Sequence, residues 1–510
     1  MEIERFVAGL RILAQNNVST TTLTRPAVNA GIVVAHDSPD YHVAFPGLCV
    51  TADGDLLCVF RQGFTHAGSS GDDGRIVAIR SGDDGASWSE PWVLVDDPAY
   101  DDRNAAVETG PDGRIALCWD KYLSPHHYGA WLALSDDGGR SFGPAMRIGI
   151  RDDVHTRSRP VWVDATHLMV PYSESVAESE DCASYVTHVD LESGEQEHVA
   201  ISRLGERGPA DETALAYNAD GSIIALIRDN DQPWLWQTQS EDGGFQWAEL
   251  RQSEIPSQFT PCDLLEADGL MICSFSFRQR RNERLVASRD GGRSWDIENS
   301  VDVFAATPGI GDRSYPATVR MPSGALGTVL YETSPHPHGG RIYFSTNPLS
   351  QFDASHESCL HADGRHEPAL LMLKPPDGDF EVSATYRFTG RFGARPHRVG
   401  WDVGGGGVTL ALSYFMGAAP DRWTDFAEGV EVAVERDGSR SVVLRQPISA
   451  SFCDGREHTL TLHRGGRRCT LLIDGQCLAD MEMPHPAQTA AFRVAGAAVA
   501  VYGITARMVT

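Results

Sequence analysis

The chain has 510 residues, more than one ordinary domain holds, so its length predicts two or three compact units with substantial cores. Its 43 Lys and Arg residues against 70 Asp and Glu residues give a formal net charge of −27, which disfavours general binding to nucleic acid or to anionic membranes. The 50 glycines, 28 prolines and 11 tryptophans are spread along the chain and favour many short strands joined by turns, hence an all-β protein.

The N-terminal segment lacks the basic and long apolar regions of a signal peptide, which predicts a cytoplasmic protein. Residues 1–29 are expected to form a short amphipathic helix and a lead-in, because apolar residues recur at helical spacing at Ile3, Phe6, Val7, Leu10 and Leu13. The apolar run at 494–506 is too short to cross a bilayer, so no membrane partner is expected. The ten scattered cysteines favour buried free thiols.

An internal repeat dominates residues 30–350. A turn followed by an apolar strand and a polar residue recurs six times, as in TADGDLLCVFR, GPDGRIALCWD and NADGSIIALIRD. The period of about 50 residues, with several short strands per unit, is typical of the blades of a β-propeller. The sequence therefore predicts a six-bladed propeller over this range.

A second motif recurs on the same period. Four segments approximate the pattern Ser-x-Asp-x-Gly-x-Ser-Trp, and they lie at residues 81–88, 135–142, 240–247 and 288–295. In such a turn the Asp carboxylate accepts backbone N–H bonds, a glycine takes positive φ and the aromatic ring packs beneath. We therefore interpret these acidic turns as structural.

These turns on a six-unit β repeat resemble the Asp-box signature of the sialidase-like, or neuraminidase-like, propeller superfamily. The resemblance implies a carbohydrate-active protein, although the superfamily includes sialidases, other glycosidases and members without catalysis.

After the repeat, residues 351–366 are polar and irregular and are expected to be a linker. Residues 367–510 contain strands of period-two alternation between Gly and Asp turns, which predicts a C-terminal β-sandwich of jelly-roll type. The stretch REHTLTLHRGGRRCTLLIDGQ resembles laminin-G and concanavalin-like domains. Packing and carbohydrate binding are both open as its role.

Propeller geometry predicts which residues line the functional mouth. The starts of first strands and the ends of second strands share one face, so their polar residues should converge around the axis. We expect these to form a substrate-binding ring of Arg61, Asp102, Arg103, Arg228, Arg278, Arg313 and Glu332. His66, in a loop near this mouth, is a candidate catalytic acid or base.

The sialidase resemblance implies further roles. Glu212 with Arg228 matches the family's Glu and Arg pair, and Tyr315 with the later Tyr-Glu matches its nucleophilic tyrosine. Asp72 or Asp73 stands where the family carries its acid–base residue, and Arg278 where it carries its third carboxylate-binding arginine.

One position departs from the family. Ala44 stands where sialidases carry the first arginine of the carboxylate-binding triad, with Arg61 and Arg313 as candidate replacements. Loss of one bidentate arginine should cost about 2 to 4 kcal/mol of binding unless another group replaces it. The substrate is thus expected to be an acidic sugar of a different shape, with a neutral sugar left open.

The predicted function is that of an exo-acting glycosidase of sialidase-like type acting on an oligosaccharide or glycoside. A polysaccharide lyase acting on a uronate and a sugar-binding protein without catalysis are the alternatives. We expect no cofactor and no metal, because His356, Cys359, His361 and His366 match no zinc-site spacing.

Overall fold

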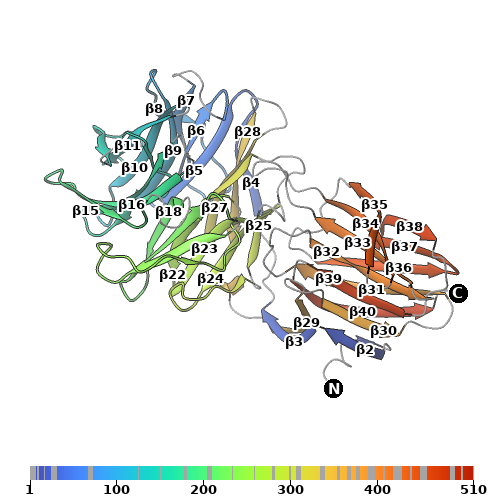
Figure 1. Ribbon diagram of the computed structural model, residues 1–510. Helices are drawn as coiled ribbons and strands as arrows, with labels where there is room; N and C mark the ends of the chain where they lie inside the picture. Colours follow the sequence, from blue (N-terminus) through green and yellow to red (C-terminus); the bar gives the residue numbers. More distant parts are fainter. Residues whose placement is uncertain are drawn as a thin grey trace.

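The computed structural model shows a chain built from β-strands (Figure 1). In the part of the chain that it describes, the helical structure is limited to a short 3-10 turn, η3, at Leu349–Phe352 and a 3-10 position at Ile297, so the all-β prediction is confirmed. The structure describes residues 7–508 except for 9–10, 17, 25–30, 67–72, 125, 150–151, 177–180, 204–209, 233, 258, 278–281, 298–299, 306–311, 334–338, 353–355, 364–368, 375–378, 389–396, 406–407, 417–427, 437–438, 448–456, 483–488 and 496–497.

Six antiparallel sheets follow one another along the repeat region, each formed mainly by consecutive strands. Such hairpin-connected sheets are what short strands with Gly-rich turns favour. The first three sheets consist of β5 (His42–Val50), β6 (Leu56–Gly63), β7 (Gly74–Ser81) and β8 (Trp92–Val95); β9 (Asp101–Thr109), β10 (Ile115–Leu123), β11 (His126–Ser135) and β12 (Met146–Ile148); and β13 (Val154–His155), β14 (Val161–Trp162), β15 (His167–Val176), β16 (Asp181–Asp190) and β17 (Gln196–Ala200). The next three consist of β18 (Ala210–Tyr217), β19 (Ile223–Asp229), β20 (Leu235–Ser240) and β21 (Arg251–Gln252); β22 (Asp263–Ala267), β23 (Leu270–Phe277), β24 (Asn282–Ser288) and β25 (Val301–Ala305); and β26 (Arg313–Arg320), β27 (Leu326–Thr333), β28 (Gly340–Asn347) and β4 (Gly31–Ser38).

The last of these sheets joins the two ends of the repeat region. Strand β4, which precedes the first sheet in the sequence, pairs antiparallel with β28 at the edge of the sixth sheet. The first strands of neighbouring sheets are also in contact, since β5 contacts both β9 and β26, and β22 contacts both β18 and β26. This arrangement is consistent with a sialidase-like propeller (Figure 1).

Three of the first strands carry a backbone irregularity at equivalent places. In β5, β9 and β26 the residues Phe45, Asn104 and Tyr315 have φ of 57°, 55° and 54°, and the pairing register of each strand shifts there. Left-handed backbone is uncommon for residues other than glycine, and a β-bulge re-aims the side chains beside it. The structure therefore repeats one strained position in several sheets, and Tyr315 occupies it in the sixth.

The acidic turns form the hydrogen bonds expected of them. In the first, the Asp83 carboxylate accepts the N–H of Ser87 at 2.9 Å and its hydroxyl at 2.6 Å, while Gly85 has a φ of 84°. The indole of Trp88 donates to the Gly85 carbonyl at 3.1 Å. The Ser87 bonds hold the pKa of Asp83 at about 2, so the carboxylate is ionised and committed to the turn.

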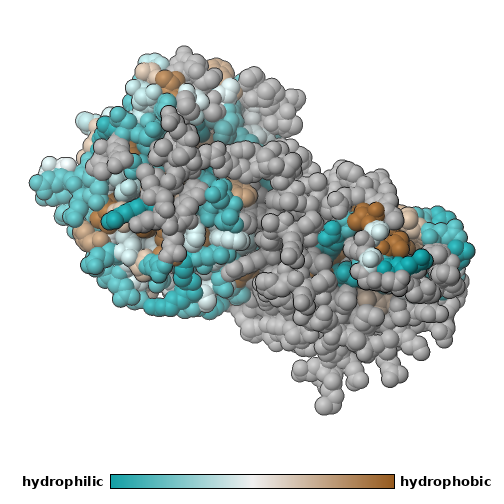
Figure 2. All heavy atoms as spheres, viewed as in Figure 1, coloured by the Kyte–Doolittle hydropathy of each residue, from teal (hydrophilic) through white to brown (hydrophobic). Residues whose placement is uncertain are grey.

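Eight of the cysteines are free thiols in the structure. Seven of them are buried, and Cys477 is exposed. Burial raises the pKa of Cys49 to about 12, so this thiol stays protonated and packs as a small apolar side chain. On the face seen in Figure 2, the described surface of the repeat region is mainly hydrophilic, with small separate apolar patches.

The C-terminal part of the chain forms two larger sheets, and strands from the N-terminus pair with both of them. The pairing is antiparallel except between β1 and β40, which run parallel. One contains β1 (Val7–Ala8), β3 (Val18–Thr24), β29 (His356–Asp363), β31 (Phe380–Phe388), β36 (His458–Gly465), β37 (Arg468–Ile473), β38 (Gln476–Glu482) and β40 (Ala498–Met508). The other contains β2 (Arg11–Asn16), β30 (Ala369–Lys374), β32 (His397–Gly405), β33 (Val408–Met416), β34 (Glu428–Arg436), β35 (Ser439–Pro447) and β39 (Thr489–Ala495).

The two C-terminal sheets share one hydrophobic core. Tyr386 and Leu462 of the first sheet and Trp401 and Leu412 of the second belong to the same buried cluster. The indole of Trp401 also donates a 3.1 Å hydrogen bond to the Leu460 carbonyl of the other sheet. The inner faces of the two sheets are thus packed against each other.

The prediction of an N-terminal helix is wrong. The segment instead forms β1, β2 and β3, which pair with β40, β30 and β29 (Figure 1). The run of β-branched residues in Val18–Thr24 favours a strand, and pairing with an existing sheet edge satisfies its backbone groups. The weak helical periodicity of residues 3–13 cannot compete with these interactions.

Part of the segment expected to be a linker is also a strand. Residues His356–Asp363 form β29, which pairs with β3 and β40. The partners of β29 come from the two ends of the chain, so no local pattern indicates the pairing. In the described part of the chain, no helix has the length and apolarity needed to cross a membrane.

Candidate active site

A buried tyrosine, a buried glutamate and a buried arginine from separate strands form one hydrogen-bonded group. The Tyr315 hydroxyl on β26 donates to Glu212 Oε1 on β18 at 3.0 Å. Arg228, at the end of β19, donates from Nη1 to Glu212 Oε2 at 2.6 Å and to the Tyr315 oxygen at 3.1 Å. The phenol therefore has a carboxylate positioned to take its proton and a guanidinium positioned to stabilise the phenolate.

The backbone beneath Tyr315 is strained and held from a third sheet. Ser314 and Tyr315 have φ of 101° and 54°, outside the region that residues with a Cβ usually adopt. Arg157 donates from Nη2 to the carbonyls of Tyr315 and Pro46, both at 3.0 Å, and its guanidinium lies 5.0 Å from the centre of the Tyr315 ring. One side chain thus links the bulges of β5 and β26.

Burial and charge set the protonation of the phenol. Burial raises the pKa of Tyr315 above its ordinary value and the charge of Glu212 adds to this effect, while Arg228 and Arg157 oppose it. Burial also disfavours the charged form of Arg228, but the nearby Glu212 carboxylate more than offsets this and raises the pKa of the guanidinium. At rest the site therefore holds a neutral phenol beside an ion pair.

A second group of buried ionisable side chains lies next to Glu212. His155 Nε2 is 2.7 Å from the carboxylate of Asp211, and the His155 ring stacks on His127 at 4.5 Å between centroids. His127 in turn lies 2.8 Å from Asp120. Although burial opposes protonation, Asp211 raises the pKa of His155 to about 9, so this pair is ionised at neutral pH. The ion pair of His155 and Asp211 fixes the backbone immediately before Glu212.

Arg61 is fully buried and is bound by protein groups at each of its nitrogens. It forms a bidentate pair with Asp101 through Nε at 2.7 Å and Nη2 at 2.9 Å. Its Nη1 donates to the Thr65 carbonyl at 2.7 Å and to His42 Nδ1 at 3.2 Å. These bonds orient Arg61 towards the neighbouring sheet. Arg61 is therefore poorly placed to replace the arginine that sialidases carry where this chain has Ala44.

The neighbouring mouth residues have different surroundings. Arg103 lies between the rings of Phe45 and Tyr122, at 5.0 Å and 4.7 Å, and 3.8 Å from Asp101. Asp102 is buried and accepts the Trp119 indole N–H at 3.1 Å. Burial raises the pKa of Asp102 to about 7. The bond to Trp119 joins Asp102 to a neighbouring strand of its own sheet.

Asp73 holds the loop that carries His66. Its carboxylate accepts the Phe64 N–H at 2.6 Å and the Thr65 hydroxyl at 2.5 Å. Arg61 Nη2 is 3.9 Å from the same carboxylate. With its oxygens accepting these bonds, Asp73 shapes the loop.

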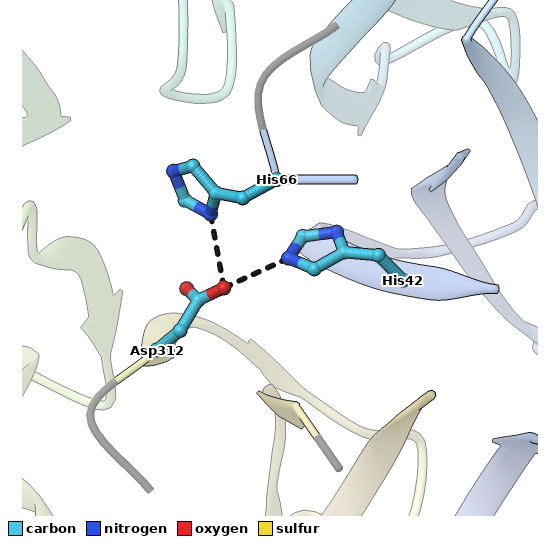
Figure 3. Close-up of side chains that lie close together, drawn as sticks. All are labelled: His42, His66 and Asp312. Atoms are coloured by element: carbon cyan, nitrogen blue, oxygen red, sulfur yellow. Dashed lines mark hydrogen bonds and ion pairs between the residues drawn. The ribbon is translucent and has the colours of Figure 1, made fainter. Parts of the chain in front are cut away.

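Figure 3 shows His42, His66 and Asp312 converging at the edge of this site. Asp312 Oδ2 lies 2.8 Å from His42 Nε2 and 2.9 Å from His66 Nδ1. The other carboxylate oxygen accepts the Tyr331 hydroxyl at 2.6 Å. Two imidazoles and a carboxylate are also a common set of metal ligands, and the ligand atoms of these three residues lie within 4.8 Å of one another.

The hydrogen bonds of His42 disfavour a metal. A guanidinium can only donate, so the Arg61 contact makes His42 Nδ1 an acceptor and places the ring proton on Nε2. That nitrogen then donates to Asp312 and has no lone pair for an ion. The hydrogen bonds of His42 therefore argue against metal binding by this cluster.

Several predicted site residues meet here and others do not. Tyr315, Glu212 and Arg228 form one hydrogen-bonded group, while Arg61, Asp73 and His66 surround the neighbouring loop. Arg313 and Glu332 are buried and face each other across β26 and β27. Asp72 and Arg278 lie outside the described residues.

Some residues in these contacts had no assigned role in the sequence analysis. They stand at or near the starts of first strands, where the repeat predicts mouth residues, but position alone does not indicate their partners. They are His42, Asp101, Arg157, Asp211 and Asp312.

Comparison with known proteins places the fold. No protein-family model and no curated protein sequence matches the chain. Among solved structures, a protein of unknown function from Dyadobacter fermentans is similar with a TM-score of 0.55 and 15% identity, covering 64% of this chain and 98% of that chain. Trypanosoma rangeli sialidase in complex with 2,3-difluorosialic acid is similar with a TM-score of 0.50 and 10% identity, covering 94% of this chain and 97% of that chain.

A Hadza microbial sialidase is similar as well, with a TM-score of 0.50 and 16% identity, covering 61% of this chain and 66% of that chain. The fold is sialidase-like. At these identities the comparison establishes the fold alone, and the chemistry has to be argued from the side chains.

Proposed function

We propose that this protein is a glycoside hydrolase that removes an acidic sugar from a glycoside, with Tyr315 as the nucleophile. The observation that carries the proposal is the Tyr315, Glu212 and Arg228 group, in which one buried phenol contacts both a carboxylate and a guanidinium. A tyrosine that can pass its proton to Glu212 becomes a phenolate able to attack an anomeric carbon.

The proposed architecture supports this site. The six sheets would be the blades of one propeller, with β4 closing the ring, and the two C-terminal sheets would form a β-sandwich. In a closed ring, the starts of the first strands lie close to the axis, where a ligand can contact several blades. The sialidase-like fold of the solved neighbours is consistent with this placement.

An acidic substrate accounts for the buried positive charge. Arg157 and Arg103 are buried beside Phe45 and Tyr315, and the Nε donor of each lacks a hydrogen-bond partner. The hydrogen bonds of Arg157 go to carbonyl oxygens and not to a carboxylate. An anionic sugar bound nearby would supply a negative charge opposite Arg157, whereas Arg103 already lies 3.8 Å from Asp101.

A chemical trap tests the nucleophile. The Trypanosoma rangeli sialidase structure is described as a covalent intermediate with 2,3-difluorosialic acid, so this reagent is a suitable probe. We expect mass spectrometry of the treated protein to find the sugar on the peptide containing Tyr315, and the Tyr315→Phe variant to form no adduct. An adduct elsewhere, or one that survives in Tyr315→Phe, would contradict the assignment.

A substrate panel tests the reaction class. The wild type is incubated with 4-methylumbelliferyl glycosides of N-acetylneuraminic acid, glucuronic acid and galacturonic acid, and with uronate polymers. We expect a released reducing sugar without a new ultraviolet chromophore. An unsaturated, ultraviolet-absorbing product would indicate a lyase, and binding without turnover would indicate a sugar-binding protein.

A further inference from the structure

The reaction proposed above also needs a proton donor for the departing group, and the loop between β6 and β7 offers one. His66 lies in this loop with 42% of its side chain exposed. Its ring packs edge-on against Phe45 at 5.6 Å between centroids, and the Tyr315 ring contacts the same Phe45 at 4.8 Å. The imidazole and the phenol are therefore held around one phenyl ring.

The surrounding hydrogen bonds determine where the protons lie. His42 receives a bond from Arg61 on Nδ1 and donates from Nε2 to Asp312, as argued above. Tyr331 donates to the other oxygen of Asp312. Burial works against ionisation of Asp312, but His42 and His66 hold the pKa of the carboxyl below its usual range. Asp312 is thus an anion that accepts bonds from its neighbours.

This assignment fixes the tautomer of His66. Since the Asp312 anion can only accept, the 2.9 Å contact requires that His66 Nδ1 carry a proton and donate it. The second nitrogen, Nε2, is then the atom that gains or loses a proton. A histidine oriented in this way by a carboxylate is a common arrangement for general acid–base catalysis.

The nearest described alternative is engaged elsewhere. Asp73, on the same loop, accepts bonds from Phe64 and Thr65 and lies beside Arg61. Protonation of Asp73 would change the acceptor sites that these two bonds use. Among the described residues of this loop, His66 is therefore the group best placed to exchange a proton with a ligand above Tyr315.

Resting on the proposed function, we propose that His66 is the general acid–base residue of this site and that Asp312 is its positioning residue. In the first step Tyr315 bonds to the anomeric carbon and gives its proton to Glu212, while the glycosidic bond breaks and its oxygen takes a proton from His66 Nε2. In the second step water attacks the anomeric carbon and gives a proton to His66, while the bond between the Tyr315 oxygen and the anomeric carbon breaks and that oxygen takes back its proton from Glu212.

Two leaving groups on one sugar test this role. The probes are the 4-methylumbelliferyl glycoside and the methyl glycoside of the sugar that the wild type cleaves in the panel above. An aryl leaving group departs without a proton donor, whereas methanol does not. We expect His66→Gln to lower kcat/KM for the methyl glycoside about 100-fold or more, with a far smaller loss for the aryl glycoside.

The ratio of the two rates is independent of the fraction of protein that is folded, so it separates a chemical role from a structural one. Asp312→Asn is expected to change this ratio in the same direction, because the ring loses the acceptor that fixes its tautomer. His167→Gln is the matched control, since His167 is also exposed and pairs with an aspartate, Asp164 at 3.1 Å, in a turn on the opposite edge of the sheets.

Each outcome decides one of the two proposals. If His66→Gln lowers both rates equally, or neither, His66 is not the proton donor, while the Tyr315 proposal stands on its own trap experiment. If the wild type cleaves none of the panel glycosides, the proposed hydrolase function fails and the role of His66 fails with it.

Discussion

The Tyr315 hydroxyl donates to Glu212 at 3.0 Å although 103 positions separate the two residues in the chain. Their strands, β26 and β18, belong to different sheets. Arg228 completes the group by contacting both partners. This contact between two sheets carries the proposed catalytic role of Tyr315.

Substitution of Glu212 tests the proton acceptor. Glu212→Gln keeps the size of the side chain but removes its ability to accept the phenol proton, so we expect kcat to fall about 10² to 10⁴-fold. The measurement is steady-state hydrolysis of the glycoside that the wild type cleaves best. Glu241→Gln, in an exposed turn, is the control and should leave kcat unchanged. A fall of less than about tenfold in Glu212→Gln would exclude Glu212 as the base.

Substitution of Arg157 tests the support beneath the nucleophile. Arg157→Met removes both hydrogen bonds to the Tyr315 and Pro46 carbonyls while keeping most of the buried aliphatic volume. A displaced nucleophile is expected to lower kcat about 10²-fold. The exposed Arg341→Met variant, which loses a surface pair with Asp37 and a contact with Tyr343, should retain wild-type kcat. An unchanged kcat in Arg157→Met would show that the bulge holds Tyr315 without this contact.

An arginine introduced at position 44 should not create the carboxylate-binding site of sialidases. Ala44 is fully buried in the core cluster that contains Phe45 and Tyr331, with no space for a guanidinium. We expect Ala44→Arg to lower the free energy of unfolding by several kcal/mol, about 1 to 3 from overpacking and the rest from a buried charge. Urea unfolding measures this, with exposed Ala86→Arg as the control. A stable Ala44→Arg protein with tighter binding of acidic sugars would contradict the expectation.

The raised pKa of Asp102 predicts a pH dependence of stability. Its carboxyl has a pKa of about 7 in the folded protein, because of burial, against about 3.9 in an unfolded chain. Between these values the folded state binds more protons, so this group lowers the free energy of unfolding as pH rises, by up to about 1.4 kcal/mol per pH unit. Above pH 7 its contribution to the slope is lost.

Asp102→Asn removes this titration. Urea unfolding at pH 5, 6, 7 and 8 should give a stability that declines less between pH 5 and pH 7 in Asp102→Asn than in the wild type. Parallel curves for the two proteins would show that Asp102 ionises normally in the fold.

The sequence by itself determined the local features. Alternating apolar residues and glycine turns predicted the strands of residues 42–347, because side-chain alternation and positive φ are properties of a few neighbouring residues. The acidic turns were predicted in detail for the same reason, as the bonds of Asp83 to Ser87 show. The position of Arg228 in the repeat placed it at the mouth, and the sialidase resemblance implied Glu212 and Tyr315 beside it.

Only the tertiary structure decided which side chains are partners. Arg61 pairs with Asp101 of the next sheet, and His66 meets Asp312 across 246 positions of chain. The N-terminal segment became strands because edges of the C-terminal sheets accept it. Such contacts depend on how the sheets pack and close, and the energy of a buried charge depends on every element around it, so no local pattern encodes them.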